Sequence, residues 1–137
     1  MRVEQTDDLA TCRTLRRVVF IDEQNVPEAE EWDGRDGEAL HLLAFDGATP
    51  IGTARLFDKG ETGKIGRVCV LASARGRGIG AALIRAGEAL LAEQGCTRAM
   101  LGAQCHAIPF YEGLGFTAFG PIYDDAGIPH RDMDKPL

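Results

Sequence analysis

The sequence feature that most constrains the fold is a turn rich in glycine and arginine, lying between an apolar segment and an amphipathic one. The apolar segment is Val68-Cys69-Val70-Leu71, and the turn follows as Arg75-Gly76-Arg77-Gly78-Ile79-Gly80-Ala81. Apolar residues then recur at helical spacing as far as Gly95, so a strand is expected to pass through the turn into a helix. Glycines let a backbone approach a ligand closely, and the free N–H groups and dipole of a helix N-terminus attract anions. The turn therefore predicts an anion-binding site.

Two common phosphate-binding loops do not fit this turn. A Walker loop ends in Gly-Lys-Ser/Thr, which is missing here. A dinucleotide-binding fingerprint needs Gly-x-Gly-x-x-Gly near the start of a βαβ unit and an acidic residue about twenty residues later. The glycines of this chain come late and follow another spacing, as Gly76, Gly78 and Gly80. The sequence therefore points to a different kind of anion site.

The pattern along the chain predicts a single α/β domain over residues 1–137. Apolar and β-branched runs predict strands at residues 2–5, 39–45, 51–57, 64–71, 99–104 and 117–121, and the tail at 130–135 is a candidate for one more. Helices are expected at residues 8–23, 78–95 and 108–114, and residues 25–37 predict a loop or a short helix. No repeat or linker interrupts this order, so we expect one sheet with helices on its faces.

Composition excludes several classes of partner. The net charge of −6 argues against nucleic acid, because phosphate backbones are bound through clustered Lys and Arg. The four cysteines, Cys12, Cys69, Cys96 and Cys105, form no CxxC pair and no Cys/His cluster, so we expect reduced thiols and no metal site. Neither a signal-peptide core nor a membrane-spanning stretch is present in the sequence, which predicts a cytoplasmic protein without a membrane partner.

The charges are unevenly distributed along the chain. Eight acidic residues crowd positions 22–38, whereas Arg67, Arg75, Arg77 and Arg85 gather around the glycine-rich turn. An acidic run of this kind could attract a cationic ligand, although such runs are more often solvated faces. The region around the glycine-rich turn thus favours an anion, and the acidic segment favours a cation or is simply solvated.

The spacing Arg75-x-x-Gly78-x-Gly80 after a strand resembles the pyrophosphate-binding motif of the GNAT superfamily of acyltransferases. The stretch Ala107-Ile108-Pro109-Phe110-Tyr111-Glu112-Gly113-Leu114-Gly115-Phe116 is similar to its second landmark, a short helix with a tyrosine before Gly-Phe. Residues 19–27, His41-Leu42, residues 52–56 and Gly127-Ile128-Pro129-His130 resemble the ElaA-like subgroup, so the likeness spans nearly the whole chain. Two departures are Gln104, where many members carry asparagine, and Cys69 inside the strand that would hold the cofactor.

The resemblance implies the GNAT fold, a mixed sheet of six to seven strands flanked by about four helices. It also implies that acetyl-CoA lies where two parallel strands splay apart, the one that ends near Leu71 and the one at residues 99–104. The cofactor-binding residues implied in this way are Val68, Cys69, Val70, Arg75, Gly76, Arg77, Gly78, Ile79, Gly80, Ala81, Gln104 and Tyr111.

Acetyl transfer to an amine needs a neutral nucleophile, donors for the oxyanion and a proton for the departing thiolate. By resemblance, Tyr111 would donate that proton, and a backbone N–H at Cys69 or Val70 would hold the oxyanion. Five side chains are open candidates for the base that deprotonates the amine: Glu23, Glu31, His41, His106 and His130. The acceptor is expected to meet Glu23, Glu31, His41, Arg55, Arg67 and His130, although the two arginines could instead pair with the acidic loop.

The function expected from these residues is transfer of an acetyl group from acetyl-CoA to a primary amine of a small molecule or peptide, by direct attack in a ternary complex. One alternative is an acyl-CoA-binding sensor or partner module without turnover, against which the presence of Tyr111 argues. Others are a transferase that uses a different acyl-CoA, and a covalent route through Cys69. The resemblance leaves a homodimer open.

Overall fold

The computed structural model describes all residues, 1–137, and contains one mixed sheet of seven strands in the order β1-β2-β3-β4-β5-β7-β6. The strands are β1 (Arg2–Thr6), β2 (Leu40–Asp46), β3 (Thr49–Lys59), β4 (Thr62–Val70), β5 (Arg98–Gln104), β6 (Thr117–Asp125) and β7 (Ile128–Pro136). Only β4 and β5 run parallel, and all other neighbours are antiparallel. The predicted sheet, including the additional strand in the tail and the edge position of residues 117–121, is confirmed.

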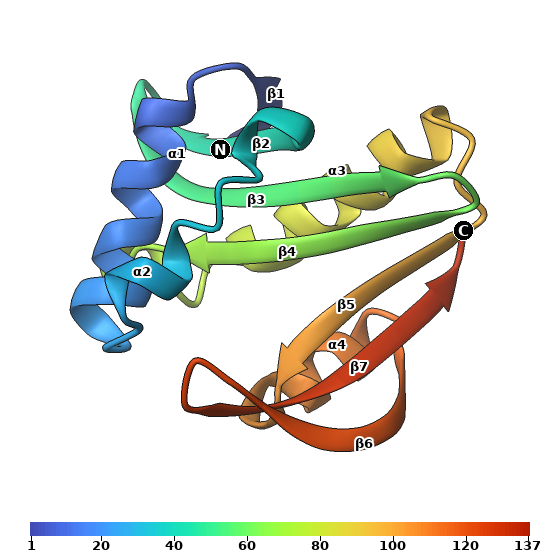
Figure 1. Cartoon of the computed structure of the whole chain (residues 1–137). Helices are drawn as coiled ribbons and strands as arrows, with labels where there is room; N and C mark the ends of the chain where they lie inside the picture. Colours follow the sequence, from blue (N-terminus) through green and yellow to red (C-terminus); the bar gives the residue numbers. More distant parts are fainter.

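Helices cover both faces of the sheet (Figure 1). The helices α3 (Ile79–Glu93) and α4 (Ile108–Gly113) lie on one face, and α1 (Leu9–Arg16) lies on the other. On the α3 side, Leu56, Ile65 and Leu101 join Leu83 and Leu91 in the main core. A smaller core on the α1 side contains Leu15, Leu43 and Cys69. None of these helices is both long and apolar enough to cross a membrane.

The predicted helix at residues 8–23 is present but changes its winding midway. Asp8 caps α1 by accepting a hydrogen bond from the Thr11 backbone at 3.1 Å. From residue 17 the chain continues as a π-helical segment, η1 (Arg17–Glu23), which widens the helix where it approaches the end of β4. Residues 25–37, expected to be a loop or short helix, contain the single turn α2 (Glu28–Glu31) and lead into a 3₁₀ turn, η2 (Asp36–Glu38).

A bulge bends β4 in the middle of the sheet. Arg67 and Val68 together oppose Ala54 of β3, because the pairing shifts from Arg55 with Gly66 to Thr53 with Cys69. Arg67 has a φ of 49°, in the left-handed region that is unusual for a residue with a side chain. Such a bulge turns the strand and reorients its side chains. The bulge lies in the half of β4 that follows Lys64 and no longer pairs with β5.

Candidate functional site

The parallel pair at the centre of the sheet opens into a V. Only Thr62, Gly63 and Lys64 of β4 pair with β5, through Arg98, Ala99 and Met100, and beyond these residues the two strands diverge (Figure 1). A cleft of about 740 Å³ lies at the opening. Its walls come from η1, the end of β4, the start of α3, the end of β5, α4 and the β6–β7 turn. The structure therefore has a large cleft at the position where the family resemblance implies two splayed strands.

The glycine-rich turn forms one end of this cleft. Gly76 and Gly78 have φ values of 79° and 77°, and a Cβ at either position would meet no atom within 4 Å. Gly78 is the N-cap of α3 and no side chain caps the helix, so the N–H groups of its first turn are available to a ligand. Because the backbone there is open and carries the positive end of a 15-residue helix, the turn fits a phosphate or pyrophosphate group.

The two arginines of the turn are both engaged in ion pairs. The guanidinium of Arg75 donates to both carboxylate oxygens of Glu23, at 2.6 and 2.9 Å, and its Nε donates to the Val70 carbonyl at 3.0 Å. Arg77 lies 3.2 Å from Asp46, and it is the one residue of the segment 75–81 that does not line the cleft. Arg75 therefore joins the anion-binding turn to the end of η1, a contact between residues that are 52 positions apart.

Tyr111 lines the cleft from α4. Gly115, with a φ of 95°, ends this helix, and the backbone of Phe116 then donates to the Tyr111 carbonyl at 3.1 Å. The ring of Phe116 is buried edge-on to the tyrosine ring, with centroids 6.0 Å apart. Burial raises the pKa of Tyr111 to about 12, so its hydroxyl stays protonated at neutral pH and can act as a proton donor.

Cys69 also lies on the cleft wall, but its thiol is unsuited to nucleophilic attack. The residue is 4% exposed, and burial raises its pKa to about 12. The thiolate is the reactive form of cysteine, and it is scarce at neutral pH when the pKa is this high. All four cysteines are free thiols, and only Cys105 is partly exposed.

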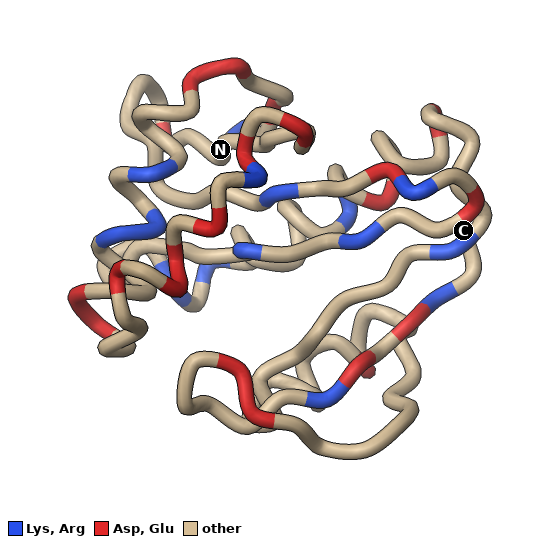
Figure 2. Tube along the Cα trace, in the orientation of Figure 1, with Lys and Arg blue, Asp and Glu red and all other residues tan.

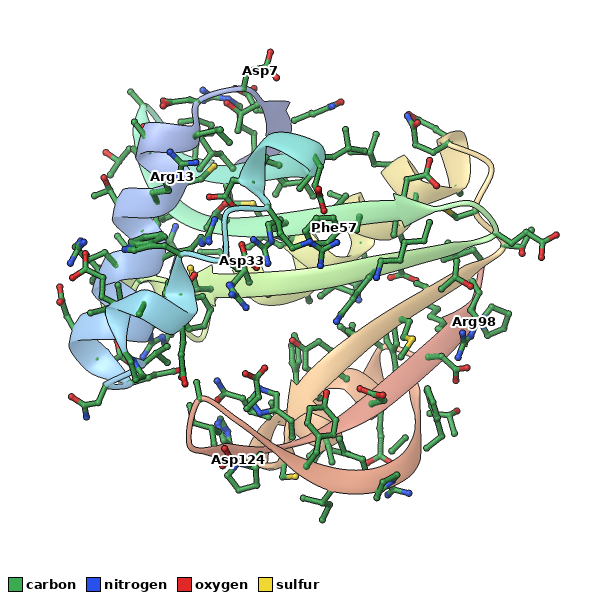
Figure 3. All side chains as sticks on the ribbon, viewed as in Figure 1. Asp7, Arg13, Asp33, Phe57, Arg98 and Asp124 are labelled. Carbon is green, nitrogen blue, oxygen red and sulfur yellow. The ribbon has the colours of Figure 1, made fainter.

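A buried ion-pair network joins α1, the segment 28–38 and strands β3 and β4. Figure 2 shows the acidic positions of this segment beside basic positions of α1, β3 and β4. Arg16, which is 1% exposed, contacts Glu31 at 2.9 Å and Asp36 at 2.8 Å. Arg55 contacts Asp36 at 3.0 Å and Asp33 at 2.8 Å, and Asp33 lies in front of β3 and β4 in Figure 3. These contacts hold the pKa of Asp33 at about 2, and they hold that of Asp36 well below its usual value.

Most carboxylates of the acidic run at positions 22–38 thus form ion pairs with arginines of the same chain. Of its eight members, Asp22 and Glu30 alone form no ion pair, and Glu30 lines the cleft. Arg55 and Arg67 were expected either to meet the acceptor or to pair with the acidic loop, and both pair with the loop. Arg55 does so inside the network, whereas Arg67 contacts Glu31 at 2.9 Å and also lines the cleft.

The structure brings most of the predicted site residues to the cleft. The predicted residues that line it are Glu23, Glu31, Arg67, Val68, Cys69, Val70, Arg75, Gly76, Gly78, Ile79, Gly80, Ala81, Gln104, His106, Tyr111 and His130. The predicted residues that do not are His41, Arg55 and Arg77. His41 is 4% exposed, and its Nε2 donates to the Asp36 carbonyl at 2.9 Å, inside the network.

Two cleft features were not predicted from the sequence. Gln104 at the end of β5 donates to Gln24 at 2.9 Å, and it accepts from Nε2 of His106 at 2.6 Å, so a chain of polar side chains crosses the opening. Tyr123 of β6 also lines the cleft, beyond the strand expected at residues 117–121. No group of three or more His, Cys, Asp or Glu side chains is arranged to hold a metal ion.

Comparison with known proteins relates this chain to acetyltransferases. The acetyltransferase (GNAT) domain family matches residues 9–137. The uncharacterized N-acetyltransferase YjcF of Bacillus subtilis is 40% identical over 122 residues, covering 88% of this chain and 87% of that protein. The crystal structure of Escherichia coli ElaA matches with a TM-score of 0.84 at 29% identity, covering 98% of this chain and 99% of that one.

A more distant structure shows the same fold. A Bacillus subtilis acetyltransferase solved in complex with CoA matches with a TM-score of 0.76 at 16% identity, covering 99% of this chain and 98% of that chain. The chain therefore belongs to the GNAT family of acetyltransferases, and it is an acetyl-CoA-dependent N-acetyltransferase.

Proposed function

We propose that this protein transfers the acetyl group of acetyl-CoA to a primary amine of a small molecule or peptide, by direct attack of the amine within a ternary complex. The observation that carries the proposal is the V between β4 and β5, because it provides one cleft with an anion-binding turn at one end and a protonated tyrosine in its wall. The relative solved with CoA bound supports a CoA site in this fold.

We assign the groups of the cleft the following roles in binding and catalysis. The turn Gly76–Gly80 holds the pyrophosphate through backbone N–H groups, and Val68 to Val70 offer backbone groups to the pantetheine arm. A backbone N–H at Cys69 or Val70 stabilises the oxyanion. Tyr111 donates a proton to the departing thiolate, and Gln104 lies at the far end of the opening. The thioester supplies the activated acetyl group.

Deprotonation of the amine carries a large free-energy cost at neutral pH. An alkylamine with a pKa of about 10.4 is a free base in roughly one molecule in two thousand at pH 7, which corresponds to about 4–5 kcal/mol. A base in the cleft is therefore needed for rapid transfer. We also expect the protein to act in the cytoplasm, a reducing compartment in which its four cysteines would stay free thiols. Residues 1–137 are proposed to act as one domain.

Calorimetric titration with acetyl-CoA tests the proposal, with an Arg75→Ala, Arg77→Ala double variant in parallel. We expect micromolar binding that the double variant weakens, followed by release of free thiol when a suitable amine is added. Binding without thiol release from any amine would instead identify a sensor, and faster release from succinyl-CoA would identify another acyl donor. Absence of binding by the native protein would overturn the proposal.

A further inference from the structure

We propose that His130 is the general base that takes a proton from the acceptor amine, an inference that rests on the proposed function. It is the only one of the five candidate side chains that combines three properties: it lines the cleft, it lies nine-tenths buried, and it has a ring nitrogen without a partner in the protein. Each property follows from its place on β7.

The first observation is the face of the sheet on which His130 lies. Along β7 it alternates with Met133, which is fully buried in the core with Leu101 and α3. His130 therefore points to the opposite face, the one that α1 covers on the other half of the sheet. Tyr111 reaches the cleft from α4, on the core side. The two groups approach the V from opposite faces, so one can serve the thiolate and the other the incoming amine.

The second observation is the protonation state of the ring. Nδ1 lies 2.8 Å from the carbonyl oxygen of Ile128, and because a carbonyl only accepts, Nδ1 carries the hydrogen. In the neutral ring Nε2 then has a lone pair. No side chain or backbone group of the protein donates to it, although the residue is only 9% exposed. A base fixed in this tautomer is ready to accept a proton from a ligand in the cleft.

The third observation is a support that holds the ring in place. Tyr123 of β6 stacks on His130 with centroids 5.9 Å apart and planes inclined by 24°. The hydroxyl of Tyr123 donates to Asp132 at 2.7 Å, which fixes the tyrosine in turn. Gly102 of β5 leaves space for that hydroxyl, since a Cβ there would lie 2.5 Å from it. Tyr123 and Asp132 are therefore positioning residues for the imidazole.

The two acidic candidates are held by arginines. Glu23 is bound at both oxygens by Arg75, which lowers its pKa. Glu31 lies between Arg16 and Arg67, each at 2.9 Å. Both carboxylates are thus occupied by guanidinium groups of the protein.

The other two histidines are also placed unfavourably for this role. His41 is buried in the ion-pair network and does not line the cleft. His106 lines the cleft, but it is exposed to solvent, and its Nε2 is engaged by Gln104 at 2.6 Å. His106 is therefore the comparison residue for His130, because both are histidines that line the cleft.

The transfer balances with these two groups. One proton of the ammonium moves to Nε2 of His130, and the freed nitrogen lone pair forms a bond to the thioester carbon. The C–S bond then breaks, and its electron pair leaves on sulfur, which takes the proton of Tyr111. The nitrogen gives up a second proton, which restores Tyr111 through water, and His130 releases its own proton to solvent. The amine thus loses two protons, one to the thiol and one to solvent.

Several ionisable groups lie near this part of the cleft. Tyr123 stacks on the imidazole, Asp125, Asp132 and Cys105 act electrostatically on Tyr123, and His106 lines the same cleft. Their charges act on the pH profile of the wild-type protein, so the test compares variants at each pH rather than relying on the position of one inflection.

The decisive experiment compares His130→Asn with His106→Asn, using thiol release with a primary amine that the wild-type protein acetylates. Asparagine at position 130 can still donate to the Ile128 carbonyl, but it cannot take up a proton. We expect kcat to fall about 10²-fold or more in His130→Asn, with acetyl-CoA affinity by calorimetry unchanged, and a clearly smaller fall of kcat in His106→Asn. In His130→Asn the remaining rate should rise about tenfold per pH unit as the free amine fraction grows.

A second variant guards against a purely structural effect. In His130→Gly, added imidazole should restore part of kcat, which a packing role would not allow. The inference is overturned if His130→Asn keeps wild-type kcat or if imidazole leaves His130→Gly unchanged while the protein still binds acetyl-CoA. In either case the proposed function stands, because the wild-type protein acetylates the amine. If the wild-type protein acetylates no amine, the proposed function and this inference fail together.

Discussion

Arg75 and Glu23 form a two-point ion pair that joins the anion-binding turn to the end of η1, with N–O distances of 2.6 and 2.9 Å. The carboxylate therefore lies on the arginine that the resemblance assigns to the pyrophosphate. Both side chains remain about two-fifths exposed, so the pair can exchange partners at modest cost. A negatively charged ligand at the turn competes with Glu23 for the same guanidinium.

Glu23→Gln is expected to bind acetyl-CoA about two- to fivefold more tightly than wild type, because a carboxylate no longer competes with the ligand for the guanidinium of Arg75. Calorimetry at low and high salt measures the effect, which should shrink as salt screens the charges. Glu28→Gln is the control, since Glu28 pairs with Arg17 at a similar distance of 2.6 Å and does not line the cleft. Weaker binding by Glu23→Gln would mean that Glu23 instead orients Arg75 for the ligand.

Tyr111→Phe should lower kcat by roughly 10²- to 10⁴-fold and leave acetyl-CoA affinity nearly unchanged, because the substitution removes only the hydroxyl. Steady-state thiol release and calorimetry separate the two quantities. Residual activity is expected, since a thiol is a fair leaving group without assistance. A variant with wild-type kcat would show that water supplies the proton to the thiolate.

The same tyrosine makes stability depend on alkaline pH. Its pKa is raised to about 12 in the folded protein, whereas an unfolded tyrosine titrates near 10. Between these values the unfolded chain has lost a proton that the folded chain retains, so the free energy of unfolding falls as pH rises, by up to about 1.4 kcal/mol per unit. Urea unfolding at pH 8 to 11 should show a shallower decline for Tyr111→Phe. Equal slopes would contradict the raised pKa.

Cys69→Ala should keep kcat within about threefold of wild type, because direct attack needs no thiol at this position. Initial rates with both substrates varied should give intersecting lines, whereas a covalent acetyl-enzyme would give the parallel lines of a ping-pong reaction. In the native protein, iodoacetamide should modify Cys105 before the three buried thiols. Loss of activity in Cys69→Ala together with parallel lines would establish the covalent route.

Asp36→Asn should reduce the free energy of unfolding by about 3–5 kcal/mol, because it removes the shared partner of the buried Arg16 and Arg55. Asp46→Asn is the control and should cost less than about 1 kcal/mol, since its pair with Arg77 is exposed. Urea unfolding measures both. Similar small losses would mean that the network rearranges around the missing charge.

The pH dependence of the network has a defined sign. The pKa of Asp33 is lowered to about 2 and that of Asp36 is lowered further, so both contribute stability above about pH 4. This contribution should be lost as the pH falls from about 4 towards 2. Asp36→Asn should therefore show a weaker loss of stability on acidification than wild type, by urea unfolding at a series of pH values.

Local signals explain which parts of the fold were predictable. The helix α3 and its C-terminus at Gly95 follow from apolar spacing and from the left-handed conformation that glycine adopts there, with a φ of 95°. The turn Gly76–Gly78 was predictable for the same reason. In each case the residues that decide the conformation lie within a few positions of one another.

Long-range pairings explain what was missed. Arg16 was not singled out, although it follows Cys12 by four residues and so lies on the apolar face of α1. That position is a usable signal for a buried charge, but its partners Glu31 and Asp36 are 15 and 20 residues away and could not be assigned. The partners of Tyr123 depend on the register of β6 against β7, and the predicted strand ended before that residue. The choice among the histidines needed the same register.

The short pairing of β4 with β5 divides the sheet into two parts, here called plates, the strands β1–β4 and the strands β5–β7, which share few backbone hydrogen bonds. Three residue pairs connect the plate β1–β4 to the plate β5–β7, and the ion pair of Lys135 with Glu88 adds a side-chain tie between β7 and α3. A ligand in the V contacts both plates and acts as a brace between them. Because β4 and β5 share only three paired positions, a ligand bound in the V would add contacts where the sheet itself supplies few backbone hydrogen bonds.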